Sequence, residues 1–149
     1  MTDGGGFDVL LVEDNPDDAE FTLRALRKAN VALRVAVAED GVAALDFLFC
    51  TGAHATRTPS TAPRVVLLDL KLPKIEGLEV LRRIKSDPRT HSVPVVVLTS
   101  SKERRDIHEA YLRGANSYIV KPVEYTELIT KLGDLVRYWL QINQNLRED

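Results

Sequence analysis

The chain has 149 residues, of which 44% are hydrophobic and 28% charged, and its formal net charge is −2. This is typical of one globular domain, and the weak charge excludes bulk attraction to nucleic acid or to an anionic membrane. The start lacks the order of a secretory signal and no apolar run reaches about 18 residues, so we expect a cytoplasmic protein. Cys50 is the only cysteine, which excludes a disulfide framework. We expect it to be a small buried residue on a helix.

Five short apolar segments, rich in Val, Ile and Leu, predict β-strands. Each is too short for a helix. Four of them hardly alternate between apolar and polar residues, as parallel strands covered on both faces require. The second segment alternates, which is typical of an edge strand. The predicted strands span 7–12, 32–38, 65–69, 94–99 and 117–120.

Segments with helical periodicity separate these strands. Asn15 can cap a helix over 15–30 with Pro16 in its first position, and acidic residues in the first turn favour the positive end of the helix dipole. Apolar residues at helical spacing predict the remaining helices. These begin after Asp40 and at Gly77, include Ile107 to Gly114, and run over about 124–146.

The regular alternation of strands and helices predicts a doubly wound α/β fold. We expect a flavodoxin-like (βα)5 sandwich whose five parallel strands have the order 2-1-3-4-5, with the second strand at an edge. The core of this single domain should span about 7–123. Residues 51–63 have turn composition and no periodicity, which predicts a long, mobile loop before the third strand.

Polar residues follow four of the predicted strands. Because the carboxyl ends of parallel strands meet at one rim, these side chains should share a shallow pocket. Three carboxylates so close together repel one another unless a cation lies between them. An all-oxygen site without histidine or thiolate favours Mg²⁺ over zinc, copper or iron. The residues are Glu13, Asp14, Asp69, Thr99, Ser100 and Lys121, followed by Pro122.

This combination of groups suits phosphoryl transfer. Asp69 follows the central strand and is the expected nucleophile, while Lys121 and Thr99 could neutralise or bind the phosphoryl oxygens. Taken singly, Asp14 could be a helix cap and Lys121 a solvated charge. Their occurrence together at four strand ends favours the functional interpretation.

The segments LLVEDNPDD, VVLLDLKLPKIEG, VVVLTSS and GANSYIVKP occur in an order and spacing that resemble the receiver domain of two-component response regulators, over essentially the whole chain. The stretches EDNPDD and DLKLP, the long loop and the ending with YWL are similar to the stand-alone receivers that work with phytochrome histidine kinases. The resemblance implies a signalling domain that assists its own phosphorylation and dephosphorylation and is not otherwise an enzyme.

The resemblance also implies roles for the residues of the site. Asp69 would accept a phosphoryl group from the phosphohistidine of a sensor histidine kinase, and water would later remove it. Mg²⁺ would be held by Glu13, Asp14 and Asp69 together with the backbone carbonyl of Lys71. Lys121 would contact the phosphoryl group.

Further positions of the family pattern concern the switch. Thr99 would hydrogen-bond the phosphoryl group after transfer, and Tyr118 would be the aromatic residue whose ring turns inward when the threonine moves. The Lys121–Pro122 bond is expected to be cis by analogy. Lys71 and Ser101 occupy positions at which family members tune dephosphorylation, which leaves the lifetime of the phosphorylated state open.

The predicted last helix is longer than the sheet that it would cover. Its apolar residues continue past the sheet, so we expect a homodimer through this helix, the fifth strand and the fourth helix. An amphipathic end that caps its own core is the alternative. Receivers usually control an attached effector, but we expect none here and no DNA binding, since no basic recognition helix is evident. The interface residues would be Tyr138, Leu140 and Ile142.

Other functions remain possible on the sequence alone. The chain could be a receiver-fold scaffold that works without phosphorylation, or a phosphate sink for a kinase. A haloacid-dehalogenase-like phosphatase would need a second Asp where Lys71 stands. A flavodoxin would need a phosphate-binding loop in place of the acidic EDNPDD.

Overall fold

The computed structural model describes residues 6–56 and 62–146. Strands and helices alternate along the chain, as predicted. The strands are β1 (Val9–Val12), β2 (Val35–Ala38), β3 (Val65–Leu68), β4 (Val95–Thr99) and β5 (Ser117–Val120). The α-helices are α1 (Pro16–Ala29), α2 (Gly41–Phe49), α3 (Gly77–Ser86), α4 (Arg104–Leu112) and α5 (Tyr125–Val136).

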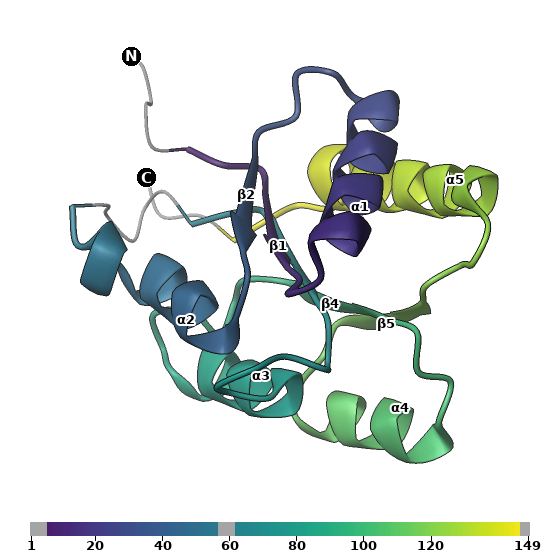
Figure 1. Cartoon of the computed structure of the whole chain (residues 1–149). Coiled ribbons are helices and arrows are strands. Elements are labelled where there is room, and N and C mark those ends of the chain that lie inside the picture. The colour runs from purple at the N-terminus through teal and green to yellow at the C-terminus, as the bar shows by residue number, and fades with distance from the viewer. Residues whose placement is uncertain (1–5, 57–61, 147–149) are drawn as a thin grey trace.

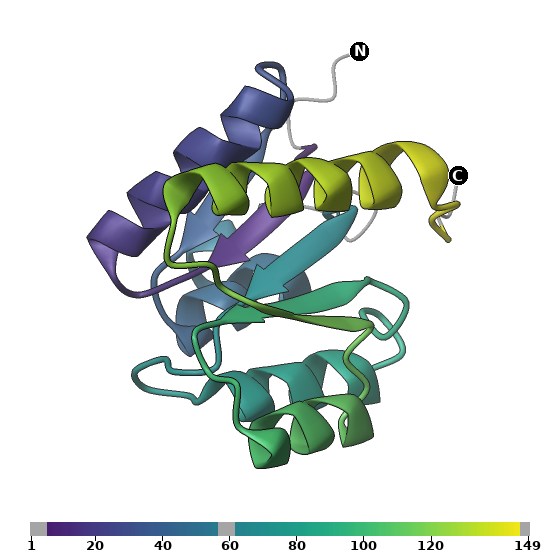
Figure 2. The same cartoon turned by 90° about the vertical axis from the view of Figure 1, so that its right-hand side faces the viewer.

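The five strands form one parallel sheet in the order β2-β1-β3-β4-β5. This confirms the predicted doubly wound α/β fold, with β2 at one edge and β5 at the other. Helices α1 and α5 lie side by side on one face of the sheet, and α2, α3 and α4 cover the other (Figures 1 and 2). The inner strands β1, β3 and β4 are therefore buried along their whole length.

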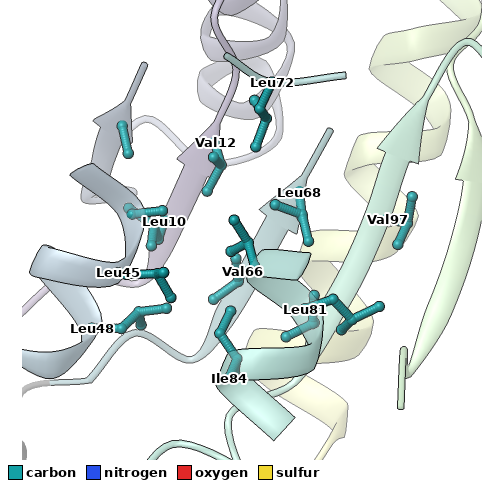
Figure 3. Packing of buried hydrophobic residues seen from close by; sticks show 14 of the residues in the cluster. Leu10, Val12, Leu45, Leu48, Val66, Leu68, Leu72, Leu81, Ile84 and Val97 are labelled. Atoms are coloured by element: carbon teal, nitrogen blue, oxygen red, sulfur yellow. The ribbon is translucent and has the colours of Figure 1, made fainter. Parts of the chain in front are cut away.

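Alternate residues of each inner strand enter two separate hydrophobic cores. Figure 3 shows the core beneath α2 and α3, where Leu10 and Val66 of the sheet meet Leu45 and Leu81 of the helices. The other core joins Leu67 and its neighbours to α1 and α5. This two-sided burial explains why the strands are almost continuously apolar.

Two helix starts follow the predicted capping pattern. The Asn15 side-chain oxygen accepts hydrogen bonds from the backbone N–H groups of Asp17 and Asp18, at 2.9 and 3.0 Å, and Pro16 occupies the first helical position. Asp40 caps α2 by accepting from the N–H of Ala43 at 2.7 Å. These caps direct both helices away from the carboxyl ends of their strands.

The strand β2 is shorter than predicted. The Asn30 side chain accepts from the N–H of Ala32, and its carbonyl accepts from the N–H of Leu33, so a turn occupies the start of the predicted strand 32–38. Sheet pairing begins only at Val35. Val37 is 46% exposed, as suits an edge strand.

The predicted helix over 124–146 is wrong beyond residue 142. After α5 the chain forms a π-helical segment, Arg137–Ile142, and then becomes extended at Asn143. The Arg64 guanidinium donates to the carbonyl of Leu140 at 3.0 Å, and the Asn145 side chain donates to the carbonyl of Arg64 at 3.0 Å. These contacts, which we call the Arg64 clamp, bring the tail back onto the domain.

The segment around Cys50 also differs from expectation. Cys50 is half-buried rather than buried, and it ends α2 in a left-handed conformation with φ 58°. Its N–H donates to the carbonyl of Asp46, so its backbone terminates the helix. A 3₁₀ turn, Gly52–His54, begins the predicted loop 51–63, and the part of that loop over 57–61 lies outside the described residues.

The expectation of a cis Lys121–Pro122 bond is wrong for this structure. All peptide bonds between described residues are trans. The trans form of an X–Pro bond is favoured by about 0.5–1 kcal/mol, so a cis bond needs a turn that requires it. None of the helices in the described part of the chain could span a membrane.

Candidate functional site

The strand register brings the predicted site residues to one rim. Val12, the last residue of β1, pairs with Ala38 on one side and Leu68 on the other. The N–H of Glu13 donates to the carbonyl of Ala38 at 3.0 Å, and the N–H of Asp69 donates to that of Val12 at 3.1 Å. The ladder thus continues one residue past each strand and fixes the backbone of both acidic residues.

Three carboxylates meet at this rim. One oxygen each from Glu13, Asp14 and Asp69 lies within 4.8 Å of the other two. Glu13 is 4% exposed, Asp69 is half-buried and Asp14 is exposed. The cluster is thus closed by protein on one side and accessible to solvent on the other. The sequence predicted this convergence from the strand ends alone.

Lys121 supplies the positive charge within the site. Its backbone N–H donates to the carbonyl of Thr99 at 2.7 Å, which aligns the end of β5 with the end of β4. Its Nζ lies 2.7 Å from Glu13, 4.0 Å from Asp69 and 3.9 Å from Asp18. Lys121 therefore pairs most closely with Glu13, and not with Asp69.

Burial and charge act in opposite directions on Glu13. Burial raises the pKa of this carboxyl, and the hydrogen bond and charge of Lys121 oppose that rise. Asp69 adds a negative charge nearby and raises the pKa of Glu13 further. A second cation at the rim would relieve this repulsion.

The loop after Asp69 is held closely against the start of α3. The N–H of Gly77 donates to the carbonyl of Leu70 at 2.9 Å. A Cβ at Gly77 would collide with the carbonyl oxygen of Asp69 and with the backbone of Leu70. Lys71 is exposed, and its N–H lies 3.4 Å from the Asp69 carboxylate. Glycine at position 77 is therefore needed for the loop that carries Asp69.

Thr99 and Tyr118 lie on neighbouring strands near the same rim. Thr99 is fully buried, and its hydroxyl is the buried side-chain polar atom without a hydrogen-bond partner in the described part of the chain. The Tyr118 hydroxyl donates to the carbonyl of Ser101 at 3.0 Å, and burial raises the pKa of Tyr118. A buried hydroxyl without a partner is a group to which a ligand could offer a hydrogen bond.

The donor set fits a hard divalent cation. The three carboxylate oxygens are close enough to share one ion, and Mg²⁺ is commonly held by one or two carboxylates together with waters and phosphate oxygens. No histidine or cysteine belongs to the cluster. Glu13 is engaged by Lys121 and by the N–H of Asn15, which leaves Asp14 and Asp69 the less constrained ligands.

Two features of the site were not predicted from the sequence. Asp18 lies near Lys121 because α1 begins at the rim, although the sequence suggested only a favourable helix charge. Ser101 donates to the Asp106 carboxylate at 2.6 Å, which ties the loop after β4 to α4. There was little sign of this pair in the sequence, because its two residues are five positions apart, whereas side chains that meet on one helix are three or four positions apart.

Similar proteins include regulatory proteins of archaea and bacteria. A probable methanogenesis regulatory protein, FilR2, of Methanothrix harundinacea is 40% identical over 139 residues, which are 93% of this chain and 87% of that protein. The bacteriophytochrome response regulator AtBRR is 47% identical, with a TM-score of 0.74 over 93% of this chain and 99% of that chain.

Solved structures of cyanobacterial regulators are also similar. The phosphorylated cyanobacterial phytochrome response regulator RcpA has a TM-score of 0.86 and 35% identity, over 94% of this chain and 98% of that chain. The Mn²⁺-bound form of Rcp1, a response regulator of Synechocystis, has a TM-score of 0.84 and 31% identity, over 94% of this chain and 99% of that chain.

The family model for the response regulator receiver domain matches residues 9–133. This range includes every strand of the sheet and all residues of the acidic rim. Membership implies a signalling domain of two-component systems that interacts with a histidine kinase, rather than a conventional enzyme. The fold, the order of the site residues and the matched range together show that the chain belongs to the response regulator receiver family.

Proposed function

We propose that this chain is a single-domain response regulator that is switched by phosphorylation of Asp69. The observation that carries the proposal is the convergence of Asp69, Asp14, Glu13 and Lys121 at one rim of the sheet. The name of the similar RcpA structure describes a phosphorylated regulator, which supports the same chemistry here. In this proposal the chain forms one receiver domain, whose core spans about 7–123 and is followed by α5 and the clamped tail.

Asp69 is the proposed nucleophile because its carboxylate is accessible and held in place. An oxygen of Asp69 would attack the phosphorus of a phosphohistidine, forming a P–O bond as the P–N bond breaks and the imidazole of the kinase leaves. The backbone of Asp69 is fixed by its hydrogen bond to Val12 and by Gly77, which suits in-line attack. Water would later attack the same phosphorus, so that the P–O bond to Asp69 breaks, inorganic phosphate is released and the carboxylate is restored.

A divalent cation is part of the proposal. Asp14, Asp69, Glu13 and the backbone carbonyl of Lys71 would hold Mg²⁺, and the Mn²⁺-bound structure of Rcp1 supports a divalent ion in the family. When bound, Mg²⁺ would offset the negative charge that gathers as a phosphoryl group approaches the carboxylates. The Nζ of Lys121 is held by Glu13 and lies 4.0 Å from the Asp69 carboxylate. It could therefore contact an oxygen of a phosphoryl group on Asp69.

The signal would leave the site through Thr99 and Tyr118. The unpartnered Thr99 hydroxyl can donate to a phosphoryl oxygen, and movement of its strand end would change the space available to Tyr118. The surface formed by α4, β5 and α5 would then present a different face to a partner. A histidine kinase of the phytochrome type is the proposed donor, because similar regulators are named for phytochrome signalling.

Intact-mass measurement after incubation with acetyl phosphate and Mg²⁺ tests the proposal. The wild type should gain the mass of one phosphoryl group, and Asp69→Asn should gain none. Asp14→Asn should react much more slowly, whereas Asp17→Asn, an exposed acid outside the cluster, should behave as wild type. Phosphoryl uptake by Asp69→Asn would contradict the proposal, and no uptake by the wild type would favour a scaffold. A phosphate sink would also gain the phosphoryl group, but its phosphorylation would not change which proteins it binds.

A homodimer through α5 and β5 is the second part of the proposal. A groove of about 660 Å³ lies between these elements, with Lys131, Asp134 and Tyr138 among its lining residues. Tyr138 is 46% and Ile142 56% exposed. Leu140, the third residue predicted at this interface, packs partly against its own core, and the Arg64 clamp holds its carbonyl.

Gly133 marks where the two copies would cross. A Cβ at this position in α5 would contact nothing within its own chain, yet a glycine inside a helix costs about 1 kcal/mol relative to alanine. Lys131 and Asp134 are exposed on either side of it. In a two-fold crossing of antiparallel α5 helices, Lys131 of one copy would face Asp134 of the other.

Sedimentation of charge variants tests this arrangement. Lys131→Glu should dissociate the dimer through like-charge repulsion, and adding Asp134→Lys should restore it. Lys102→Glu, an exposed charge ahead of α4, is the matched control. A monomeric wild type at micromolar concentration would contradict the dimer, as would a double variant that stays dissociated.

A further inference from the structure

The hydroxyl of Ser101 links the loop after β4 to the first turn of α4. Its Oγ donates to the Asp106 carboxylate at 2.6 Å and accepts from the backbone N–H of Glu103 at 3.2 Å. Glu103 is the N-cap residue of α4, and its own side chain makes no capping hydrogen bond. The serine therefore satisfies the backbone N–H of the N-cap residue itself from outside the helix. We call these two bonds the Ser101 relay.

The relay is a modified capping box. In an ordinary capping box, an acidic side chain three residues after the N-cap accepts directly from the N-cap N–H. Asp106 occupies that position, but the hydroxyl of Ser101 stands between its carboxylate and the N–H of Glu103. Because a hydrogen bond to a charged acceptor is stronger than a neutral one, Asp106 should hold the serine firmly. The position of Ser101 is thus tied to the position of α4.

The backbone of the same serine holds Tyr118. The carbonyl of Ser101 accepts the Tyr118 hydroxyl at 3.0 Å, so one residue contacts α4 through its side chain and β5 through its backbone. Thr99, whose hydroxyl has no partner among the described residues, lies two positions before Ser101. Burial raises the pKa of Tyr118, and the negative charge of Asp106 adds to that rise.

We propose that Ser101 and Asp106 are positioning residues for Tyr118, and that the relay between them sets how much of the time the tyrosine stays hydrogen-bonded to the loop after β4. The relay fixes the direction of the Ser101 carbonyl, which is the acceptor that Tyr118 needs. Without it, the loop gains freedom, the carbonyl turns away for part of the time, and the ring turns toward solvent. This inference rests on the proposed function, since it concerns the regulation of the same site.

The relay also assigns a role to Ser101. The serine hydroxyl is engaged by Asp106 and by the N–H of Glu103, both of which belong to the start of α4. Its hydroxyl is thus committed to α4. It would act on the orientation of Tyr118 rather than on water at the phosphoryl group. Substitutions of Ser101 should accordingly change the switch more than the chemistry at Asp69.

NMR of the purified protein with ¹³C-labelled tyrosine tests the inference. The Tyr118 signal among the four tyrosines is assigned by its loss in Tyr118→Phe. Ser101→Ala and Asp106→Ala should each shift this signal toward that of a solvent-exposed tyrosine. The double variant should shift it no further, because both changes break the same link.

Conservative and control variants separate positioning from a general loss of structure. Asp106→Asn keeps an oxygen that can accept from Ser101, so it should restore most of the wild-type Tyr118 signal. Arg105→Ala removes an exposed side chain from the same turn and should change nothing. If Ser101→Ala does not fold, the pair Asp106→Ala and Asp106→Asn gives the same comparison.

Two results would overturn the inference. One is an unchanged Tyr118 signal in folded Asp106→Ala, and the other is a double variant whose shift equals the sum of the single shifts. Neither depends on phosphoryl uptake, because the measurement is made without a phosphodonor. Failure of the relay and failure of Asp69 phosphorylation are therefore distinguished.

Discussion

Strands β3 and β5 belong to the same sheet, but the chain uses them differently. All four residues of β3 are buried, and Asp69 follows at its tip. All four residues of β5 are half-buried, and Tyr118 lies within it. A strand covered on both faces holds a reactive group in one place, whereas an edge strand leaves a large side chain free to take more than one position. We infer that the fold holds the phosphoryl acceptor at the centre of the sheet and the movable tyrosine at its edge.

The largest expected difference between the two regions is in stability. Leu67 of β3 and Ile119 of β5 contact the same hydrophobic core, but Leu67 is fully buried and Ile119 only partly so. Leu67→Ala should lower the free energy of unfolding by about 3 kcal/mol, and Ile119→Ala by about 1 kcal/mol. Urea denaturation measures both. Equal losses would mean that the edge strand is as constrained as the centre.

A second comparison uses two glycines within helices. Gly77→Ala should lower the free energy of unfolding by about 2 kcal/mol and slow phosphoryl uptake, because its Cβ would displace the Asp69 backbone. Gly133→Ala, on the side of the sheet next to β5, should stabilise the monomer by about 1 kcal/mol, since its Cβ contacts nothing. Thermal unfolding at low protein concentration measures both. A tolerated alanine at 77 would contradict the close approach at the centre.

The smallest expected effect concerns Asp40, an acidic residue that follows β2 at the other edge of the sheet. Asp40 follows β2 and caps α2, and the hydrogen bond from the N–H of Ala43, together with Lys74, lowers its pKa. Asp40→Ala should lower the free energy of unfolding by about 1 kcal/mol at pH 7. The folded pKa lies below the unfolded one, so this contribution is full above pH about 4 and is lost as the pH falls through the folded value.

Urea denaturation at pH 7 and pH 3 measures the Asp40 contribution, with Glu39→Ala, an exposed neighbour, as the control. The difference between wild type and Asp40→Ala should shrink at the lower pH. A difference that grows there would show that the charge of Asp40 does not stabilise the cap. Phosphoryl uptake should be unaffected, which would separate this acid from those that follow β1 and β3.

The centre of the molecule was the most predictable part. The apolar run of β3 admits few alternatives, and its position in a parallel sheet places Asp69 beside Glu13. The capping role of Asn15 is also local and was predicted correctly. By contrast, the turn around Asn30 shortened β2, because side-chain hydrogen bonds to the backbone replaced strand pairing.

The less predictable features depend on contacts between distant residues. Helical periodicity continued past residue 142, but Arg64, 76 positions before Leu140, decides how the tail lies. Lys121 and Glu13 are 108 positions apart in the sequence. Predicting that Lys121 pairs with Glu13 rather than with Asp69 would require knowing how deeply each carboxylate is buried. The trans bond before Pro122 was missed because that expectation came from analogy rather than from the residues themselves.

The Arg64 clamp has a practical consequence. Arg64 immediately precedes β3, and Asp69 immediately follows it. A force or a fused protein that pulls on residues 143–146 would therefore act, through Asn145 and Arg64, on the strand that carries the phosphorylation site. Affinity tags are therefore better attached at the other terminus.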